Sequence, residues 1–300
     1  MPSTFNYDFS GHGWEGKSSF STGLFIGGKF VDGIEGKMID VINPSTGQEI
    51  CKVSEGAYNE SWGLKVPAAQ RGKLFSKLSY LIEKHSDELA ALESLDNGKA
   101  WSVAKAVDVS GAAGVFRYYA GWCDKHGGKI VEVDESKLAY TRHEPIGVVG
   151  QVIPWNFPSK RFKETLSISY EYVFLLSWKL GPALATGNTV ILKPSEVTPL
   201  TAIRVAHLVI EAGFPPGVVN IVTGYGNTAG AAISSHMEIE KVAFTGSTIV
   251  GRYIMKAAAD SNLKNVTLEL GGKSPNIVCN DADIDQAVKW SAFGIFFNHG

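Results

Sequence analysis

The sequence contains few cysteines, and they form no cluster. Its three cysteines, Cys51, Cys123 and Cys279, lie far apart, and none belongs to a Cys-x-x-Cys pair. A disulfide framework or a structural zinc site needs several cysteines at close spacing, so neither is predicted. Free cysteines are typical of a reducing compartment, and we expect a cytoplasmic protein that holds no metal ion.

The sequence also lacks an excess of charge of either sign. Its 28 lysines and arginines are balanced by 30 aspartates and glutamates, so there is no net field to hold nucleic acid or an anionic membrane. Residues 1–23 contain no arginine and match neither a secretory signal nor a transit peptide. No apolar run is long enough to span a bilayer. We expect a small-molecule ligand, with no nucleic-acid or membrane partner.

The hydrophobic residues, 44% of the 300, suffice for a large core, and their pattern changes along the chain. The first 55 residues are rich in strand and turn signals, which predict an outer layer rather than a core. Residues 66–122 have helical periodicity and predict two or three helices. Residues 129–144 alternate as the two strands of a β-hairpin do.

After Pro145, short apolar strands alternate with helical segments. The strands read IGVVGQVIP, NTVILKP, GVVNIVTG, IEKVAFTG and KNVTLEL. This alternation predicts an α/β fold with a parallel sheet that is covered by helices on both faces. Such sheets bind ligands at the carboxyl ends of their strands, so the residues that follow each strand are candidates for a site.

One candidate is the octet FTGSTIVG, Phe244 to Gly251, which follows a strand and opens a helix. Glycine there lets backbone N–H groups approach an anion, and Ser247 can cap the helix, so a phosphate could bind. The alternative is an ordinary glycine turn with a serine cap. The octet is not the Gly-x-Gly-x-x-Gly fingerprint of many dinucleotide sites.

A second candidate is ILKPSE, which places Lys193 and Glu196 just after another strand. The lysine could hold a ribose hydroxyl or a phosphate. The carboxylate could accept two ribose hydroxyls and would repel a 2′-phosphate. The alternative is a solvated ion pair on the surface.

Two further motifs suggest catalysis. LELGG places Glu269 at the end of an apolar strand, where desolvation would raise the pKa of the carboxyl and suit it to act as a general base. PWNFP holds Asn156 in a stiff context from which its amide could donate to an oxyanion. The alternatives are a partly exposed glutamate beside a turn and a simple turn asparagine.

Together, PWNFP, SWKLGPALATGNTVILKPSE, AGFPPGVVNIVTGYG, VAFTGST, LELGGKSPNIV and GIFFNHG resemble one family. From Leu24 to Gly300, the chain looks like an NAD(P)-dependent aldehyde dehydrogenase of the fungal general type. The resemblance implies an α/β fold with a Rossmann-type sheet in an NAD-binding domain over 1–128 and 147–270. It also implies an oligomerisation hairpin over 129–146 and the beginning of a catalytic domain over 271–300.

The resemblance implies an oxidoreductase that converts an aldehyde to a carboxylic acid with NAD, through a cysteine thiohemiacetal and an acyl-enzyme, and that forms homo-oligomers. Asn156 would be the oxyanion donor and Glu269 the base that activates water. Lys193 and Glu196 would meet the adenosine ribose, and Glu196 favours NAD, although NADP stays open. The other cofactor-binding residues that the resemblance implies are Trp155, Gly226, Phe244, Gly246, Ser247, Thr248, Ile249, Val250, Gly251 and Leu270.

The chain departs from the family pattern at three places. The family's nucleophilic cysteine is expected just after Gly300, so we expect a truncated, inactive chain, with a packing role for Cys279. Residues 159–176 look inserted and are either a real loop near the substrate or translated intron. A helix expected between Glu55 and Trp62 is missing. The alternative to an enzyme is a non-catalytic nucleotide-binding fragment or the product of a faulty gene prediction.

Overall fold

A computed structural model gives the fold of the chain. It describes residues 3–11, 13–32, 38–42, 49–54, 62, 66–154 and 172–296, with only the backbone at 38–42, 49–54 and 172. Trp155, Asn156, most of the segment 159–176 and the shortened stretch after Glu55 lie outside the described residues.

The centre of the fold is a seven-stranded sheet with the order β13-β12-β9-β10-β11-β3-β4. Its first five members pair in parallel, which confirms the predicted parallel sheet. They are β9 (Val148–Val152), β10 (Thr189–Lys193), β11 (Val219–Ile221), β12 (Lys241–Gly246) and β13 (Asn265–Leu270). The hairpin of β3 (Leu24–Ile26) and β4 (Lys29–Val31) adds two antiparallel strands at the far edge.

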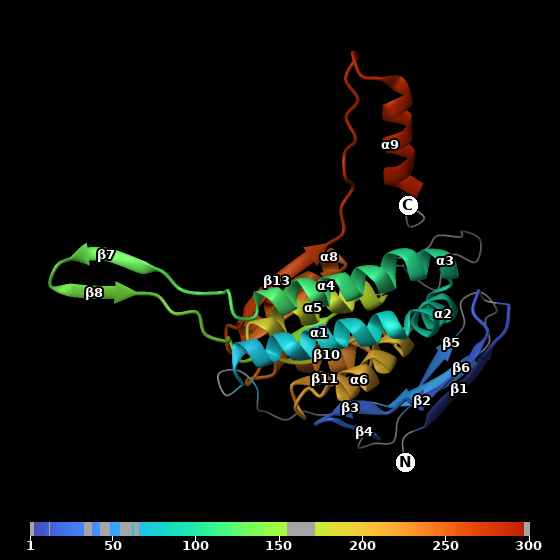
Figure 1. Ribbon diagram of the computed structural model, residues 1–300, viewed down its shortest axis with the longest axis horizontal. Helices are drawn as coiled ribbons and strands as arrows, with labels where there is room; N and C mark the ends of the chain where they lie inside the picture. Colours follow the sequence, from blue (N-terminus) through green and yellow to red (C-terminus); the bar gives the residue numbers. More distant parts are fainter. Residues whose placement is uncertain are drawn as a thin grey trace.

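Helices cover both faces of the sheet, because neighbouring residues of each buried strand point to opposite sides. In β10, Val190 and Leu192 face one cluster and Ile191 faces the other. The first cluster contains side chains of α1 (Ala68–Lys84), α4 (Ser110–Trp122), α5 (Tyr172–Ala185) and α6 (Leu200–Ala212). The second contains Ile233 and Ile254 of α7 (Ala231–Ser235) and α8 (Thr248–Asp260) (Figure 1).

The predicted helical region of 66–122 contains α1, α2 (Ser86–Asn97), the short α3 (Trp101–Val103), the π-helix η2 (Ala104–Val109) and α4. Gly98 ends α2 in the left-handed conformation, with φ of 82°. Just after it, the Lys99 ammonium lies 2.9 and 2.7 Å from the two carboxylate oxygens of Asp108, and neither side chain is exposed. This ion pair joins the turn after α2 to η2.

The N-terminal strands contribute more to the core than the sequence predicted. The antiparallel ribbon of β1 (Thr4–Phe9) and β2 (Gly16–Ser21) buries Phe5, Phe9 and Phe20 in a cluster with apolar residues of α2 and α6. The expectation of a mere outer layer was wrong, because three phenylalanines on one face of the ribbon need an apolar partner. Strands β5 (Met38–Ile42) and β6 (Glu49–Ser54) form a separate pair.

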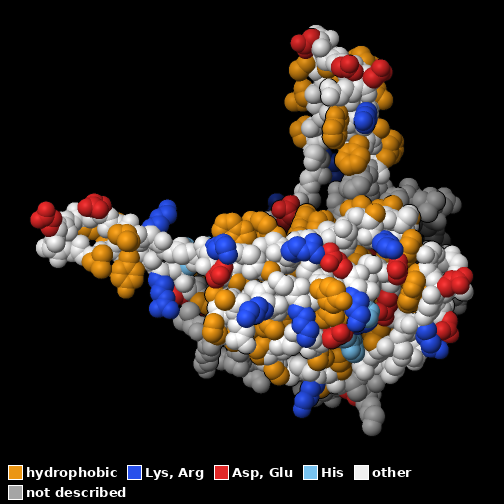
Figure 2. Space-filling model, viewed as in Figure 1, with side chains coloured by type: hydrophobic (Ala, Val, Ile, Leu, Met, Phe, Trp, Pro, Cys, Tyr) orange, Lys and Arg blue, Asp and Glu red, His pale blue; other side chains and the backbone are white. Residues whose placement is uncertain are grey.

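Two elements project from the body. The predicted hairpin is formed by β7 (Ile130–Asp134) and β8 (Lys137–Tyr140), and helix α9 (Ile284–Phe296) stands off on the extended segment 271–283 (Figure 1). Apolar side chains are exposed on both, including Ile130, Leu138 and Trp290 (Figure 2). Within the described ranges, no helix has the length and apolar character to cross a membrane.

Candidate functional site

The candidate site lies along one edge of the sheet. Strands β10, β12 and β13 are parallel members of the same sheet, so their carboxyl ends point the same way. This places Lys193, Gly246 and Leu270, the last residues of these strands, along that edge. Since neighbouring strands are about 4.8 Å apart and β9 lies between β10 and β12, the edge offers a surface on the order of 10 Å or more in width.

Lys193 and Glu196 form a pair that is largely withdrawn from solvent. The Lys193 side chain is 3% exposed, and its Nζ donates to the Pro194 carbonyl at 2.9 Å and to Glu196 Oε2 at 3.2 Å. Glu196 stays 31% exposed. A buried ammonium needs such acceptors. The pair is therefore not the solvated surface ion pair of the alternative interpretation. It presents the Glu196 carboxylate at the end of β10, in contact with the buried Lys193 ammonium.

Helix α8 begins as the sequence predicted. Ser247 is its N-cap, with extended backbone angles, and its side chain accepts a hydrogen bond from the Val250 N–H at 3.3 Å. Residues Ser247, Thr248, Ile249 and Val250 are exposed. The first turn of α8 contains no acidic side chain, so its positive dipole end is free of intrahelical compensation. This arrangement suits an anion beside two exposed apolar side chains.

Two of the predicted cofactor residues act through shape. The Phe244 ring is buried, and a Cβ on Gly246, whose φ is 157°, would lie 2.5 Å from it. Likewise, a Cβ on Gly251 would lie 2.8 Å from Cδ2 of Leu270. The glycines let the backbone cross Phe244 and let α8 pack against the end of β13. Larger residues would push the first turn of α8 away from the sheet edge.

Glu269 is exposed, which corrects the expectation that it is desolvated. The reason is its strand: β13 is the outermost strand of the sheet, and Leu268 and Leu270, but not Glu269, contact the apolar cluster beneath α8. Glu269 acts instead on Lys179 of α5. Burial lowers the pKa of Lys179, and the Glu269 charge partly offsets this effect.

Two residues near this edge, Lys179 and Gln151, were not predicted from the sequence as site residues. Gln151 is a buried residue of β9 whose Nε2 donates to the Lys179 carbonyl at 2.7 Å. This bond joins the carboxyl-end half of β9 to the helix that carries Lys179. The available signal was a glutamine inside the apolar segment GVVGQVIP and a lysine inside the largely apolar segment SWKLGPALA.

Gly226 opens the short π-helix η3 (Gly226–Gly230), which leads into α7. A Cβ on Gly226 would meet nothing within 4 Å, and one on Gly230 would lie 3.8 Å from Cδ of Lys193. Thus η3 lies beside the lysine at the end of β10. Trp155 and Asn156 lie outside the described residues, so their placement beside this edge stays a prediction.

The side chains of two cysteines, Cys123 and Cys279, are described. Cys123 is buried, its Sγ donates to the Tyr119 carbonyl, and burial raises the pKa of its thiol. Cys279 is exposed, so the packing role that the sequence suggested was wrong: segment 271–283 extends away from the body. The described ranges contain no group of three or more His, Cys, Asp or Glu residues that could hold a metal ion.

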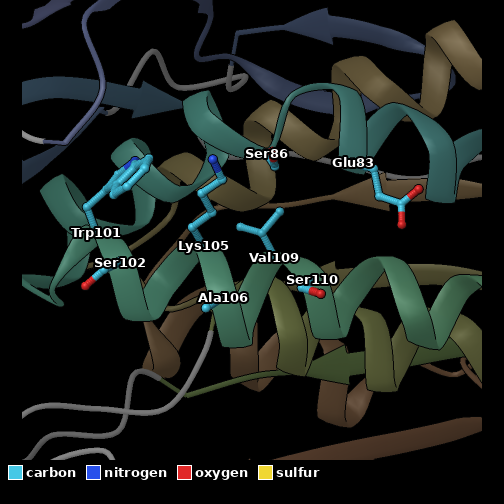
Figure 3. Close-up of a pocket in the computed structure, with 8 residues that line it drawn as sticks. All are labelled: Glu83, Ser86, Trp101, Ser102, Lys105, Ala106, Val109 and Ser110. Atoms are coloured by element: carbon cyan, nitrogen blue, oxygen red, sulfur yellow. The ribbon is translucent and has the colours of Figure 1, made fainter.

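A cavity of about 480 Å³ lies elsewhere, on the helical side of the molecule. Figure 3 shows its floor on η2, with Lys105 beside Trp101 at one end and Glu83 of α1 at the other. Lys105 Nζ lies 4.9 Å from the Trp101 ring centre and 2.6 Å from Asp87 Oδ1. None of the predicted site residues lines this cavity. The remaining lining residues are Ser86, Ser102, Ala106, Val109 and Ser110.

Comparison with known proteins gives the same family over most of the chain. The sequence profile described as "Aldehyde dehydrogenase family" matches residues 30–300. An aldehyde dehydrogenase of Agaricus bisporus is 54% identical over all of this chain and 60% of its own length. The human protein called "Aldehyde dehydrogenase, mitochondrial" is 50% identical over 94% of this chain and 54% of its own length.

Solved structures agree. The NAD⁺ complex of an aldehyde dehydrogenase from Bacillus cereus superposes with a TM-score of 0.84 at 46% identity, over 93% of this chain and 57% of that protein. An NAD complex of PnpE superposes with a TM-score of 0.83 at 43% identity, over 92% of this chain and 56% of that protein. The chain thus spans little more than half the length of the relatives that it matches.

Proposed function

The chain belongs to the aldehyde dehydrogenase family, and on this basis we propose that it supplies the NAD-binding half of an oxidoreductase that converts an aldehyde to a carboxylic acid. One observation carries the proposal: three strands of one sheet bring the Lys193–Glu196 pair, the capped start of α8 and Glu269 to the same edge. Ligands bind at this edge in parallel sheets.

The residues fit a dinucleotide. The Glu196 carboxylate would accept the hydroxyls of the adenosine ribose, with Lys193 beneath it. The backbone at Gly246 and Ser247 would lie against the pyrophosphate, and the exposed Ile249 and Val250 would support a flat base. When bound, NAD supplies an acceptor for hydride.

We propose NAD rather than NADP as the cofactor. The 2′-phosphate of NADP would lie against the Glu196 carboxylate. The Lys193 ammonium already donates a hydrogen bond to that carboxylate. Repulsion by a carboxylate is the usual basis of discrimination against the phosphate. Lys193 could serve a phosphate only if it left Glu196 and the Pro194 carbonyl.

For the chemistry, we propose Glu269 as the base that takes a proton from water and Asn156 as a donor to the oxyanion. Exposure leaves Glu269 free to reach a water molecule, and Lys179 supplies a nearby positive charge. Cys123 is buried with a raised pKa, which makes it a poor nucleophile. We propose neither Cys123 nor Cys279 as the nucleophile that attacks the aldehyde. We therefore expect the 300-residue chain to bind NAD without reducing it.

The test is calorimetric titration of the purified chain with NAD and with NADP. We expect saturable NAD binding, weaker NADP binding, and loss of discrimination in Glu196→Gln. Glu211→Gln, which changes an exposed glutamate at the end of α6, is the matched control and should leave both affinities unchanged. Absence of saturable NAD binding by the folded chain would overturn the proposal.

The second candidate function is a nucleotide-binding module without dehydrogenase activity. This function predicts the same result in the NAD titration. A second measurement separates the two functions: the appearance of NADH absorbance when aldehyde is added. No NADH with the isolated chain fits both functions. NADH formed by the full-length protein from the same source fits only the enzyme.

For the domains, we propose an NAD-binding domain over 1–128 and 147–270, an oligomerisation hairpin over 129–146 and the beginning of a catalytic domain at 271–300. The exposed apolar residues of β7, β8 and α9 support this division, because a two-stranded hairpin and an apolar helix are marginal in water without a partner. Light scattering of the chain and of a form without 129–146 tests whether the hairpin joins copies.

We also propose a cytoplasmic location, supported only by the free Cys123 and Cys279.

A further inference from the structure

The N-terminal ribbon of β1 and β2 lies before the residues that the family profile matches. Polar contacts with the start of α2 and with the middle of α6 anchor it, in addition to its three buried phenylalanines. Ser18 Oγ of β2 donates to Oε1 of Glu88 at 2.6 Å, and Arg204 of α6 donates to both oxygens of that carboxylate at 2.9 Å. His85 Nδ1 lies 3.1 Å from Glu88 Oε2.

His207 lies beside this cluster and contacts the ribbon directly. Its Nε2 lies 3.3 Å from the Ser21 carbonyl of β2, to which it can only donate. The imidazole stacks on Phe30 at 4.0 Å between ring centres and meets the edge of Phe20 at 5.8 Å. The ring is therefore held between two aromatic residues of the N-terminal strands and closes the gap between β2 and α6.

We propose that His207 is an acid-sensitive latch: the neutral ring holds the β1–β2 ribbon on α6, and protonation of the ring favours release of the ribbon.

The charges around the ring favour its neutral form. On α6, Arg204 lies one turn before His207, and Glu211 one turn beyond is exposed. On α2, Glu88 is shared by Arg204, Ser18 and His85. Strands β2 and β4 present to the ring the Ser21 carbonyl and the two phenylalanines. No carboxylate is thus left to receive an imidazolium among these described neighbours, since Glu88 is already engaged.

The direction of the pH effect follows from the two states of the ribbon. Burial and the Arg204 charge lower the pKa of His207 below its ordinary value of 6.5, although the Ser21 bond and the Glu88 charge act the other way. Well above that value the ring is neutral whether the ribbon is bound or released, so pH has no effect. Below it the released ring takes up a proton first, and the bound state loses stability until pH reaches the folded pKa.

Glu88 does not share this pH window. Burial raises its pKa, but the hydrogen bonds from Arg204 and Ser18, together with the charges of Arg204 and His85, outweigh burial and leave the pKa below its ordinary value of 4.5. The carboxylate therefore stays ionised from neutral pH down to about pH 5.5, and a change in that range belongs to a histidine.

Hydrogen exchange of the full 300-residue chain tests the latch. After correction for intrinsic exchange, the opening equilibrium of peptides from 3–22 should rise between about pH 7.5 and about pH 5.5, by at most about tenfold, the limit for one proton on a released ring with the ordinary pKa of 6.5. Peptides from the core of α6 should keep their protection. His207→Gln keeps a donor for the Ser21 carbonyl, and His207→Phe keeps the stacking; both should remove the pH dependence.

Control variants test whether His207 is the group that titrates. His143→Gln changes an exposed histidine far along the chain and should retain the full pH effect. If His85→Gln removes the effect and the His207 variants keep it, His85 is the titrating group and the proposal is wrong. It is also wrong if acid increases protection of the ribbon, since attraction between the imidazolium and Phe30 would then exceed the cost of burial. Simultaneous loss of protection in α6 would mean global unfolding and would equally overturn the latch.

Discussion

Lys193 lies beneath the carboxylate of Glu196, with its Nζ 3.2 Å from Oε2 and its side chain almost fully buried. The lysine therefore holds the carboxylate in place instead of meeting solvent itself. We predict that Lys193→Met weakens NAD binding about tenfold or more, because an unsupported Glu196 loses one charge-assisted hydrogen bond of about 1.5–3 kcal/mol. Calorimetry measures the change. Lys241→Met, on the partly exposed start of β12, is the control, and equal loss in both variants would contradict the prediction.

The buried pair of Lys99 and Asp108 gives a second prediction. Removing one partner in Lys99→Met leaves a carboxylate whose pKa is already raised by burial, with no cation beside it. The free energy of unfolding should fall by about 3–5 kcal/mol. The double variant Lys99→Met/Asp108→Leu should recover most of this loss. Urea unfolding measures both, and a double variant no more stable than the single one would show that the pair itself is needed.

The packing of β9 against α7 predicts a strong effect at Gly150. A Cβ there would lie 2.4 Å from Cγ2 of Ile233, within the cluster on that face of the sheet. Gly150→Ala should lower the free energy of unfolding by about 1–3 kcal/mol through overpacking. Gly114→Ala is the matched control: a Cβ at this position of α4 meets nothing within 4 Å. It should stabilise the helix by about 0.5–1 kcal/mol. Urea unfolding of both variants measures the difference.

The cap of α8 predicts coupled losses of stability and of cofactor binding. Ser247→Ala removes the acceptor of the Val250 N–H and should cost about 0.5–2 kcal/mol of unfolding free energy. It should also weaken NAD binding at the start of the helix. Ser235→Ala at the exposed end of α7 is the control, and its effect on both quantities should be small. A normal affinity in Ser247→Ala would separate the cap from the cofactor.

The network around Glu88 predicts a loss of stability in acid. The pKa of Glu88 is lowered in the folded chain, so its contribution is complete above the ordinary pKa of 4.5 and falls as pH decreases through the folded value. Glu88→Gln should flatten this part of the stability curve and lower stability at neutral pH. Glu83→Gln, which changes an exposed partner of Arg117, should leave the curve unchanged. Urea midpoints at neutral pH and below pH 4.5 provide the comparison.

Local sequence patterns predicted the elements well where one residue's conformation decides the outcome. Ser247 caps α8, as its position between a strand and a helical segment indicated. The patterns failed where a neighbour distant in sequence decides. Glu269 was expected to be desolvated from the apolar residues beside it, but β13 is the edge strand, and the order of strands in a sheet is not encoded in any one of them. The packing role expected of Cys279 was wrong for a similar reason, because segment 271–283 extends away from the body.

By itself, the sequence determined the family, the alternation of strands and helices, and the residues that follow each strand, because period, glycine and proline act within a few residues along the chain. Only the tertiary structure decided which of these residues meet. It buried Lys193 under Glu196, brought Lys179 into the field of Glu269, and stacked His207 on Phe30. These contacts join residues from separate elements, and their burial and charge depend on packing that no short segment specifies.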